Sequence, residues 1–176
     1  MSRPLWYELA PRDDRLVRRL GEHGRFNYRL MFEQGRVDEW PDLRWSSDED
    51  VPRDWLWPID SFRLVSPRVR EVFEQNAGKR DDIQRIPGTV VTNDGVEHPY
   101  LVPHFPTWHD VLDPEETTWG PSGSPMRWVL SCAKLDGLSV FIVPGTVDPV
   151  IVSPAVLEGL RLIGATGFDA KPARRV

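Results

Sequence analysis

The sequence predicts an α+β fold, a single domain in which two related strand–helix–strand modules contribute to a mixed or antiparallel sheet, with an N-terminal addition. Phe62–Val91 and Val150–Val176 each contain an apolar strand, a Ser-Pro pair, a run with helical apolar spacing and a second strand. Hydrophobic residues make up 40% of the 176 residues and charged residues 28%, which is typical of a folded globular chain. These observations together predict one domain that contains a duplicated module.

The Ser-Pro pairs, Ser66-Pro67 and Ser153-Pro154, mark where a strand ends and a helix begins. A serine hydroxyl at this position accepts a hydrogen bond from a backbone amide that has no partner inside the helix. Proline at the first helical position has its φ already set and has no amide to leave unpaired. The two pairs therefore predict equivalent helix starts in the two modules.

The residues after each pair agree in register as well. Apolar side chains recur at helical spacing in both segments, as Val69, Val72 and Phe73 in the first and Val156, Leu157, Leu160 and Ile163 in the second. Once two turn residues are omitted, the second strands correspond too, with Ile83 matching Phe168, Pro87 matching Pro172 and Val91 matching Val176. Agreement along strand, helix and strand indicates duplication.

The N-terminal third predicts a short strand, a short helix and a second strand. Residues 5–9 are mostly apolar, which indicates the first strand. Carboxylates at Asp13 and Asp14, a narrow apolar face and Gly21 predict a helix over residues 13–21. Residues 26–33 alternate between apolar and polar side chains, the period of a half-buried strand.

Residues 36–60 have no periodic pattern and predict a long loop, which is uncommon in a compact domain unless it is functional. The segment contains four of the eight tryptophans and an acidic run at 48–50. One interpretation is that the indoles clamp the loop onto the sheet while the acids remain in water. The other is an aromatic and acidic contact surface of the kind enriched at protein interfaces.

The remaining elements follow from turn and spacing signals. Asn93, Asp94 and Gly95 predict a hairpin turn, and apolar residues in 105–116 have helix-compatible spacing. Residues 117–125 predict a Gly, Pro and Ser loop, and 127–130 and 140–143 predict strands. The predicted domain, residues 1–176, thus divides into an N-terminal addition with a Trp-rich loop (1–60), a first module with hairpin (61–104), a connecting region (105–149) and a second module (150–176).

Composition restricts the class of function. The formal net charge of −5 argues against nucleic acid as the main partner, because phosphate binding requires a basic surface. Cys132 is the sole cysteine, so no internal disulfide can form. The first eight residues show no signal peptide, and no apolar run approaches a membrane span, so we expect a cytoplasmic protein without a membrane partner.

Candidates for chemistry are few. One cluster resembles metal ligands or an acid–base pair, but its spacing matches no ligand arrangement; its members are His98, His104, His109, Asp110 and Asp113. The Gly-rich segment 120–124 lacks the glycine spacing of a nucleophile elbow. We therefore predict no catalytic residue, metal or cofactor, and keep two alternatives: a small metal-dependent hydrolase using this histidine region, and a scaffold that self-associates through its tryptophan-bearing loops.

Several segments resemble a known family, the eleventh immunity-protein family of bacterial polymorphic toxin systems, long catalogued as a domain of unknown function. The resemblance covers about the last two thirds of the chain, and the stretch before Asp60 does not share it. Its strongest part is the strand and helix of the second module, which end in Thr166-Gly167-Phe168. The other segments that carry it are the strand and helix around Val65-Ser66-Pro67, the strand 83–91, Tyr100-Leu101-Val102 and Asp110–Asp113.

The resemblance implies a protein encoded beside a toxin, which binds that cognate toxin and blocks it, and it transfers no catalytic residue. The acidic balance is consistent with an inhibitor that covers a basic surface. Oligomeric state stays open. If contact is made through exposed aromatic and acidic side chains, the expected partner-binding residues are Trp40, Trp45, Asp48, Glu49, Asp50, Trp108 and Trp119.

Overall fold

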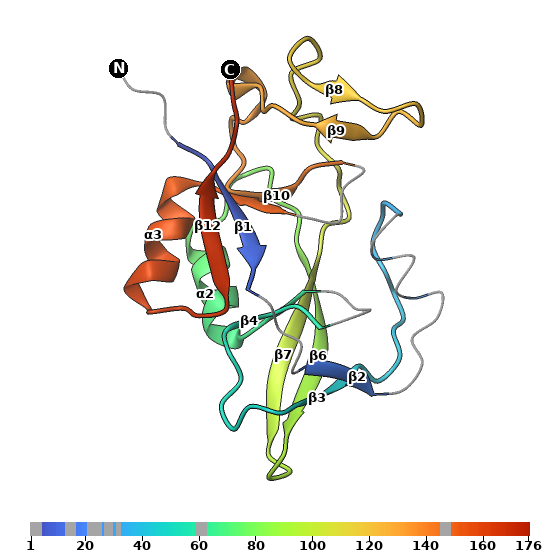
Figure 1. The fold of residues 1–176 in the computed structure, drawn as a ribbon, viewed down its shortest axis with the longest axis vertical. Coiled ribbons are helices and arrows are strands. Elements are labelled where there is room, and N and C mark those ends of the chain that lie inside the picture. Colours follow the sequence, from blue (N-terminus) through green and yellow to red (C-terminus); the bar gives the residue numbers. More distant parts are fainter. Residues whose placement is uncertain are drawn as a thin grey trace.

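The computed structural model describes residues 5–12, 17–20, 26, 30, 33–58, 63–144 and 149–176 and shows a mixed α+β fold (Figure 1). A four-stranded antiparallel sheet has the order β10 (Val140–Ile142), β11 (Val150–Val152), β1 (Tyr7–Pro11), β12 (Phe168–Pro172). A six-stranded sheet has the order β2 (Val17–Leu20), β3 (Arg44–Ser47), β6 (Gln84–Thr92), β7 (Glu97–His104), β5 (Leu64–Val65), β4 (Trp55–Leu56), with only the β3–β6 pair parallel. The remaining described elements are α2 (Pro67–Gln75), α3 (Pro154–Leu162), the 3₁₀ turn η1 (Cys132–Lys134) and the hairpin β8 (Thr118–Trp119) and β9 (Pro125–Arg127).

Both predicted modules are present, as β5–α2–β6 and β11–α3–β12. Ser66 caps α2 with φ −68° and ψ 161°, and its hydroxyl accepts from the backbone N of Val69. Ser153 caps α3 with φ −70° and ψ 163° and accepts from the backbone N of Val156. The Ser-Pro interpretation is therefore confirmed at both helix starts.

The correspondence extends to strand order and register. In each module an antiparallel strand lies between the two module strands, β7 between β5 and β6 and β1 between β11 and β12. Leu101 of β7 pairs with Val65 and Pro87. Tyr7 of β1 pairs with Val152 and Pro172 in the same way. The N-terminal strand thus occupies in the second sheet the position that β7 occupies in the first.

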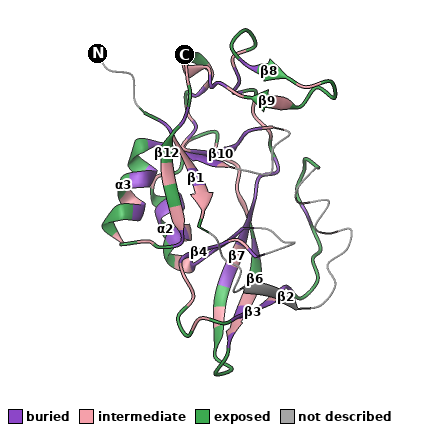
Figure 2. Cartoon of the chain, in the orientation of Figure 1, coloured by how far each residue is buried: buried purple, intermediate pink, exposed green. Residues whose placement is uncertain are grey.

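The two helices lie side by side and cover the same region of the molecule (Figure 1). They meet at equivalent positions, because a Cβ added at Gly159 would lie 2.7 Å from Cγ1 of Val72. Their inner faces are buried and their outer faces exposed (Figure 2). The first of three apolar core clusters joins Val69 and Leu160 of the helices to Leu9 of β1, so β1 completes the central core.

Contacts between the modules are reciprocal. The buried carboxylate of Asp54, just before β4, accepts from the Ser66 hydroxyl at 2.7 Å and from the backbone N of Thr166, in the loop after α3, at 3.1 Å. In the opposite direction, the Asp81 carboxylate in the loop after α2 accepts from the backbone N of Ser139 at 2.7 Å. The loop after each helix is thereby joined to the residue just before an edge strand of the other sheet, β4 or β10.

Five sequence-based predictions differ from the structure, one of them the loop 117–125, which contains β8 and the first residue of β9. Residues 17–20 of the predicted helix 13–21 form strand β2, and the rest of that segment lies outside the described residues. Phe26 and Leu30 of the predicted strand 26–33 are helical, and of the rest only 33 is described. The predicted loop 36–60 contains β3 and β4, with 59–60 outside the described residues, and 105–116 contains no helix. Instead, Leu112 forms an isolated bridge with Leu130.

Other predictions are confirmed. The first strand is β1, the hairpin is β6–β7 with Gly95 at φ 82°, and the strand 140–143 is β10. The strand predicted at 127–130 is reduced to the end of β9 and the bridge at Leu130. Within the described ranges, no helix has the length and apolar composition needed to cross a bilayer.

Candidate functional site

The structure separates the tryptophans that the sequence groups together. Trp45 on β3 is fully buried, and its ring packs against Gly88 of β6, where an added Cβ would lie 2.6 Å from the indole. Trp45 is therefore a core residue, and the prediction that it is exposed to a partner is wrong. Trp108 and Trp119 line one surface groove, and Trp40 lines another.

The acidic run lies beside the β6–β7 turn, where the side-chain amide of Asn93 donates to the backbone O of Asp48 at 3.2 Å. Asp48 and Asp50 are exposed. Glu49 is half-buried and forms an ion pair with Arg53 at 2.9 Å. The run borders neither of the two grooves described here, so the structure does not join it to the exposed tryptophans.

The first groove, which we call the hairpin groove, lies between residues 108–112 and the β8–β9 hairpin and has a volume of about 390 Å³. Trp119 of β8 is 47% exposed at its edge, whereas Trp108 is half-buried and packs on the central core. The hairpin projects from the body of the molecule at the end opposite the β6–β7 turn (Figure 1). The groove is therefore open to a partner.

Hydrogen bonds below the hairpin hold its two strands in place. The backbone N of Val129 donates to the buried Thr117 hydroxyl at 3.2 Å, and the backbone N of Asp113 donates to the Val129 carbonyl at 2.8 Å. The Asp113 carboxylate accepts from the backbone N of Glu115 and of Glu116, each at 3.0 Å. The short hairpin thus has a fixed base, so Trp119 is presented on an ordered support.

The charges around the hairpin groove are mainly negative. Glu115 and Glu116 are exposed on the turn that precedes β8. Asp110 is 79% exposed at the side chain and is bound by Lys134 at 2.8 Å, and the same ammonium group donates to the Leu112 carbonyl. A partner that combines basic and apolar groups is complementary to this surface.

Burial lowers the pKa of His109 below its ordinary value of 6.5, and Arg80 adds a repulsive charge, although Asp81 and Asp82 act in the opposite direction. The folded protein therefore resists protonation of this ring more than the unfolded chain does. The contribution of neutral His109 to the free energy of unfolding is fully present above about pH 6.5. It is lost as the pH falls below this value, until the ring in the folded protein also takes up a proton.

We expect His109→Gln to lessen the loss of unfolding free energy between pH 7 and pH 5.5. Glutamine cannot gain a proton, so the uptake by the unfolded chain disappears. Urea unfolding at a series of pH values measures the difference between the two proteins. Parallel curves for the two would show that His109 does not contribute to the pH dependence.

His98 and His104 do not converge on one point with His109. The Nε2 atom of His104, at the end of β7, lies 2.8 Å from the Gly35 carbonyl. His98 lies earlier on β7 opposite Val90, and its Nε2 is buried without a hydrogen bond to any described residue. Among the described residues, no group of three His, Cys, Asp or Glu side chains is placed to hold a metal ion.

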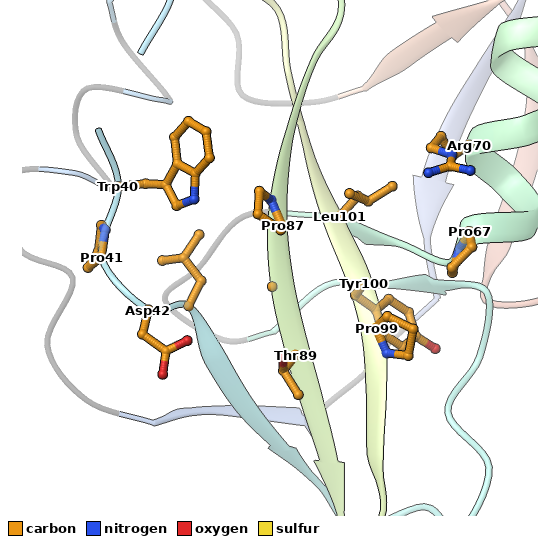
Figure 3. Close-up of a pocket in the computed structure, with 12 residues that line it drawn as sticks. Trp40, Pro41, Asp42, Pro67, Arg70, Pro87, Thr89, Pro99, Tyr100 and Leu101 are labelled. Atoms are coloured by element: carbon orange, nitrogen blue, oxygen red, sulfur yellow. The ribbon is translucent and has the colours of Figure 1, made fainter. Parts of the chain in front are cut away.

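The second groove, which we call the Trp40 groove, has a volume of about 460 Å³ (Figure 3). It lies across the open face of β6 and β7, between the segment 40–43 and the start of α2. Sequence analysis includes Trp40 but misses the rest of the lining. The signal available in the sequence is the prolines of the β6–β7 hairpin. Pro87 and Pro99 lie on the face of the hairpin opposite the buried Ile86.

Each groove is lined by a partly exposed indole, Trp40 in one and Trp119 in the other, and side chains of this kind are enriched where proteins bind one another. Comparison of the chain with protein-family models and with curated protein sequences gave no match.

Proposed function

We propose that the chain, as a single domain of the cytoplasm, is an immunity protein that binds and neutralises a cognate bacterial toxin by stoichiometric protein–protein contact. The observation that carries the proposal is the exposed Trp119 beside the hairpin groove. The resemblance of the last two thirds of the sequence to the immunity-protein family supplies the kind of partner. The proposal assigns no reaction, metal or cofactor to the chain.

Exposed apolar side chains on the hairpin support a contact role. Met126 of β9 is 73% exposed and Trp119 is 47% exposed, and the residue after Trp119, Gly120, leaves room for the methionine, because a Cβ there would lie 3.2 Å from its Cγ. Tryptophan and methionine are enriched where proteins bind one another, and a rigid indole loses little conformational entropy on binding. The hairpin is therefore the proposed centre of the interface.

The acidic groups near the hairpin groove would raise the rate and selectivity of association with a basic toxin surface. Glu115 and Glu116 supply this charge and form no salt bridge among the described residues. Asp110 already forms an ion pair with Lys134. Trp108 belongs to the proposed interface with Trp119. Residues 48–50, of which Asp48 and Asp50 are exposed, form a separate segment, and their role as partner contacts is a further part of the proposal.

We expect Trp119→Ala to weaken toxin binding by about 2 kcal/mol or more while changing the free energy of unfolding by less than about 1 kcal/mol. The difference arises because the indole is half-exposed in the free protein and becomes fully desolvated only in the complex. Calorimetric titration against the purified product of the adjacent upstream reading frame measures the affinity. Leu162→Ala, which removes an apolar side chain that is 78% exposed on α3, is the control.

Co-expression with that reading frame tests the function itself. Rescue of growth by the wild-type chain, and weaker rescue by Trp119→Ala than by Leu162→Ala, is the expected result. Failure of the wild-type chain to rescue or to form a complex would reject the immunity function. Equal affinity of all three proteins would instead move the interface away from the hairpin groove. Light scattering at several concentrations separates toxin binding from self-association through the same apolar hairpin.

A further inference from the structure

We propose that the Trp40 groove is a second docking site, which takes a short peptide segment of a partner protein with a carboxylate next to one large apolar side chain. The groove shares no lining residue with the hairpin groove. The proposal therefore does not depend on the toxin or on the immunity function.

Comparison of the two modules shows what is unusual at the groove. By the shared register, Arg70 of α2 stands where α3 has Leu157, and Arg85 of β6 stands where β12 has Ala170. Leu157 is fully buried in the central core, and Ala170 packs against the same core. The first module has two arginines where the second buries apolar side chains, and the sheet face beside Arg70 remains open as the Trp40 groove.

Arg70 and Arg85 share a single carboxylate, that of Glu74. Oε1 of Glu74 lies 3.0 Å from Nε of Arg85 and 3.7 Å from Nε of Arg70, so one carboxylate serves both guanidinium groups and lies nearer to Arg85. Nε of Arg70 is buried without a hydrogen-bond partner in the described part of the chain. The Arg70 side chain is 38% exposed, so its terminal nitrogens can take a second carboxylate from the groove, and a guanidinium binds a carboxylate through two parallel hydrogen bonds.

The position of the anionic end follows from the other charges. Arg70 lies on the α2 side of the groove, next to Pro67, where the helix begins and its backbone dipole is positive (Figure 3). Asp42 lies on the opposite side, with the segment that carries Trp40 (Figure 3). A carboxylate in the groove is therefore attracted to the Arg70 side and repelled from the Asp42 side.

Between these two sides the groove is apolar. Pro87 and Leu101 are paired across β6 and β7 and present their side chains on the same open face, with Pro99 further along β7. Trp40 is 39% exposed and faces Pro87 across the groove (Figure 3). Proline rings and an indole provide a surface on which one aromatic or large aliphatic side chain can be desolvated.

Strand pairing leaves little room for strand addition at this groove. Thr89 of β6 is paired on both sides, with β3 and with β7, and Leu101 of β7 is paired with β5 and with β6. The proposed recognition therefore comes from side chains, the carboxylate at Arg70 and the apolar group against Trp40.

The test uses short peptides with blocked ends, in which one tryptophan is flanked on either side by glutamate or, in matched peptides, by glutamine. Amide chemical shifts of the ¹⁵N-labelled full chain are followed during titration with each peptide. Arg70→Gln and Trp40→Ala are the groove variants, and Arg161→Gln, at an exposed arginine of α3, and Trp119→Ala are the matched controls. Thermal unfolding confirms that each variant is folded. If Arg70→Gln does not fold, Trp40→Ala supplies the test.

The expected result is that the glutamate peptide shifts the amides of Gly88, Thr89 and Leu101 and binds about fivefold more tightly than the glutamine peptide. This preference should disappear in Arg70→Gln and persist in Arg161→Gln, and Trp40→Ala should weaken both peptides. Trp119→Ala should change neither.

Four results would overturn the proposal. These are equal binding of the glutamate and glutamine peptides, displacement of the peptide by inorganic phosphate at the same concentration, absence of shifts at the groove, and loss of binding in Trp119→Ala. The second of these would identify a simple anion site.

Discussion

Replacing Gly167 with alanine is expected to destabilise the protein by about 3 kcal/mol or more, or to prevent folding. Gly167 is buried, has φ +95° and lies in the loop that joins α3 to β12. An added Cβ would overlap the backbone carbonyl of Trp55 and lie 3.1 Å from Cβ of Arg53. Neither neighbour can move without disturbing β4, so the contact between the modules would open.

Gly164→Ala provides the matched control in the same loop. Gly164 has φ +62°, and an added Cβ there meets nothing within 4 Å. Its substitution should cost only the backbone strain of a left-handed alanine, about 1 to 2 kcal/mol. Urea unfolding measures both variants. Equal losses at the two positions would contradict the close approach of the loop to β4.

Asp54→Ala is expected to reduce the free energy of unfolding by about 3 kcal/mol. The change removes the acceptor for the Ser66 hydroxyl, which itself caps α2, and the acceptor for the backbone N of Thr166. It also leaves Arg68, 3.5 Å from the carboxylate, without that ion pair. One side chain thus supports a helix start in one module and a loop in the other.

Asp169→Ala is the control for Asp54, because it breaks an ion pair with Arg12 in which both side chains are more than half exposed. Such a surface pair contributes less than about 1 kcal/mol. Asp54→Asn keeps the shape and one acceptor oxygen, so we expect an intermediate loss. If Asp54→Ala were no more harmful than Asp169→Ala in chemical denaturation, the carboxylate would not connect the modules energetically.

Local signals explain why the modules could be predicted from the sequence. The Ser-Pro pair combines a side-chain cap with a preset φ, and both effects act within three residues. The same holds for the β6–β7 turn, where Gly95 adopts a positive φ. Such features need no knowledge of the rest of the chain, and they appear in the structure at the expected residues.

The failures occur where distant partners decide the local structure. Val17–Leu20 has two apolar and two basic residues, a pattern compatible with helix or strand, and its pairing with β3 makes it a strand. In 105–116, the apolar spacing suggests a helix, but Val111 and Leu112 are instead buried in a second core cluster that contains Leu130. Val111 and Leu112 are therefore buried, as the apolar spacing indicates, but in a segment that is not a helix.

Site prediction was limited in the same way. Composition identifies tryptophans as candidate contacts but does not show that Trp45 lies beneath Gly88 while Trp119 stands on a projecting hairpin. The open face of β6 and β7 depends on strand pairing, so its prolines could not be combined with Arg70 from sequence spacing alone. Comparison of the two modules reveals the difference, because Arg70 in the first module is equivalent in position to the buried Leu157 in the second.

The placement of β1 has a consequence for how the protein is made. β1 is synthesised long before both of its neighbours, β11 and β12, which lie on the other side of the first module in the sequence. The first module has no such delay, since β5, α2, β6 and β7 are consecutive. During translation the first module can form from consecutive segments, whereas Leu9 and its strand must wait until β11 and β12 have been made, so the pairing of β1 is a long-range closure.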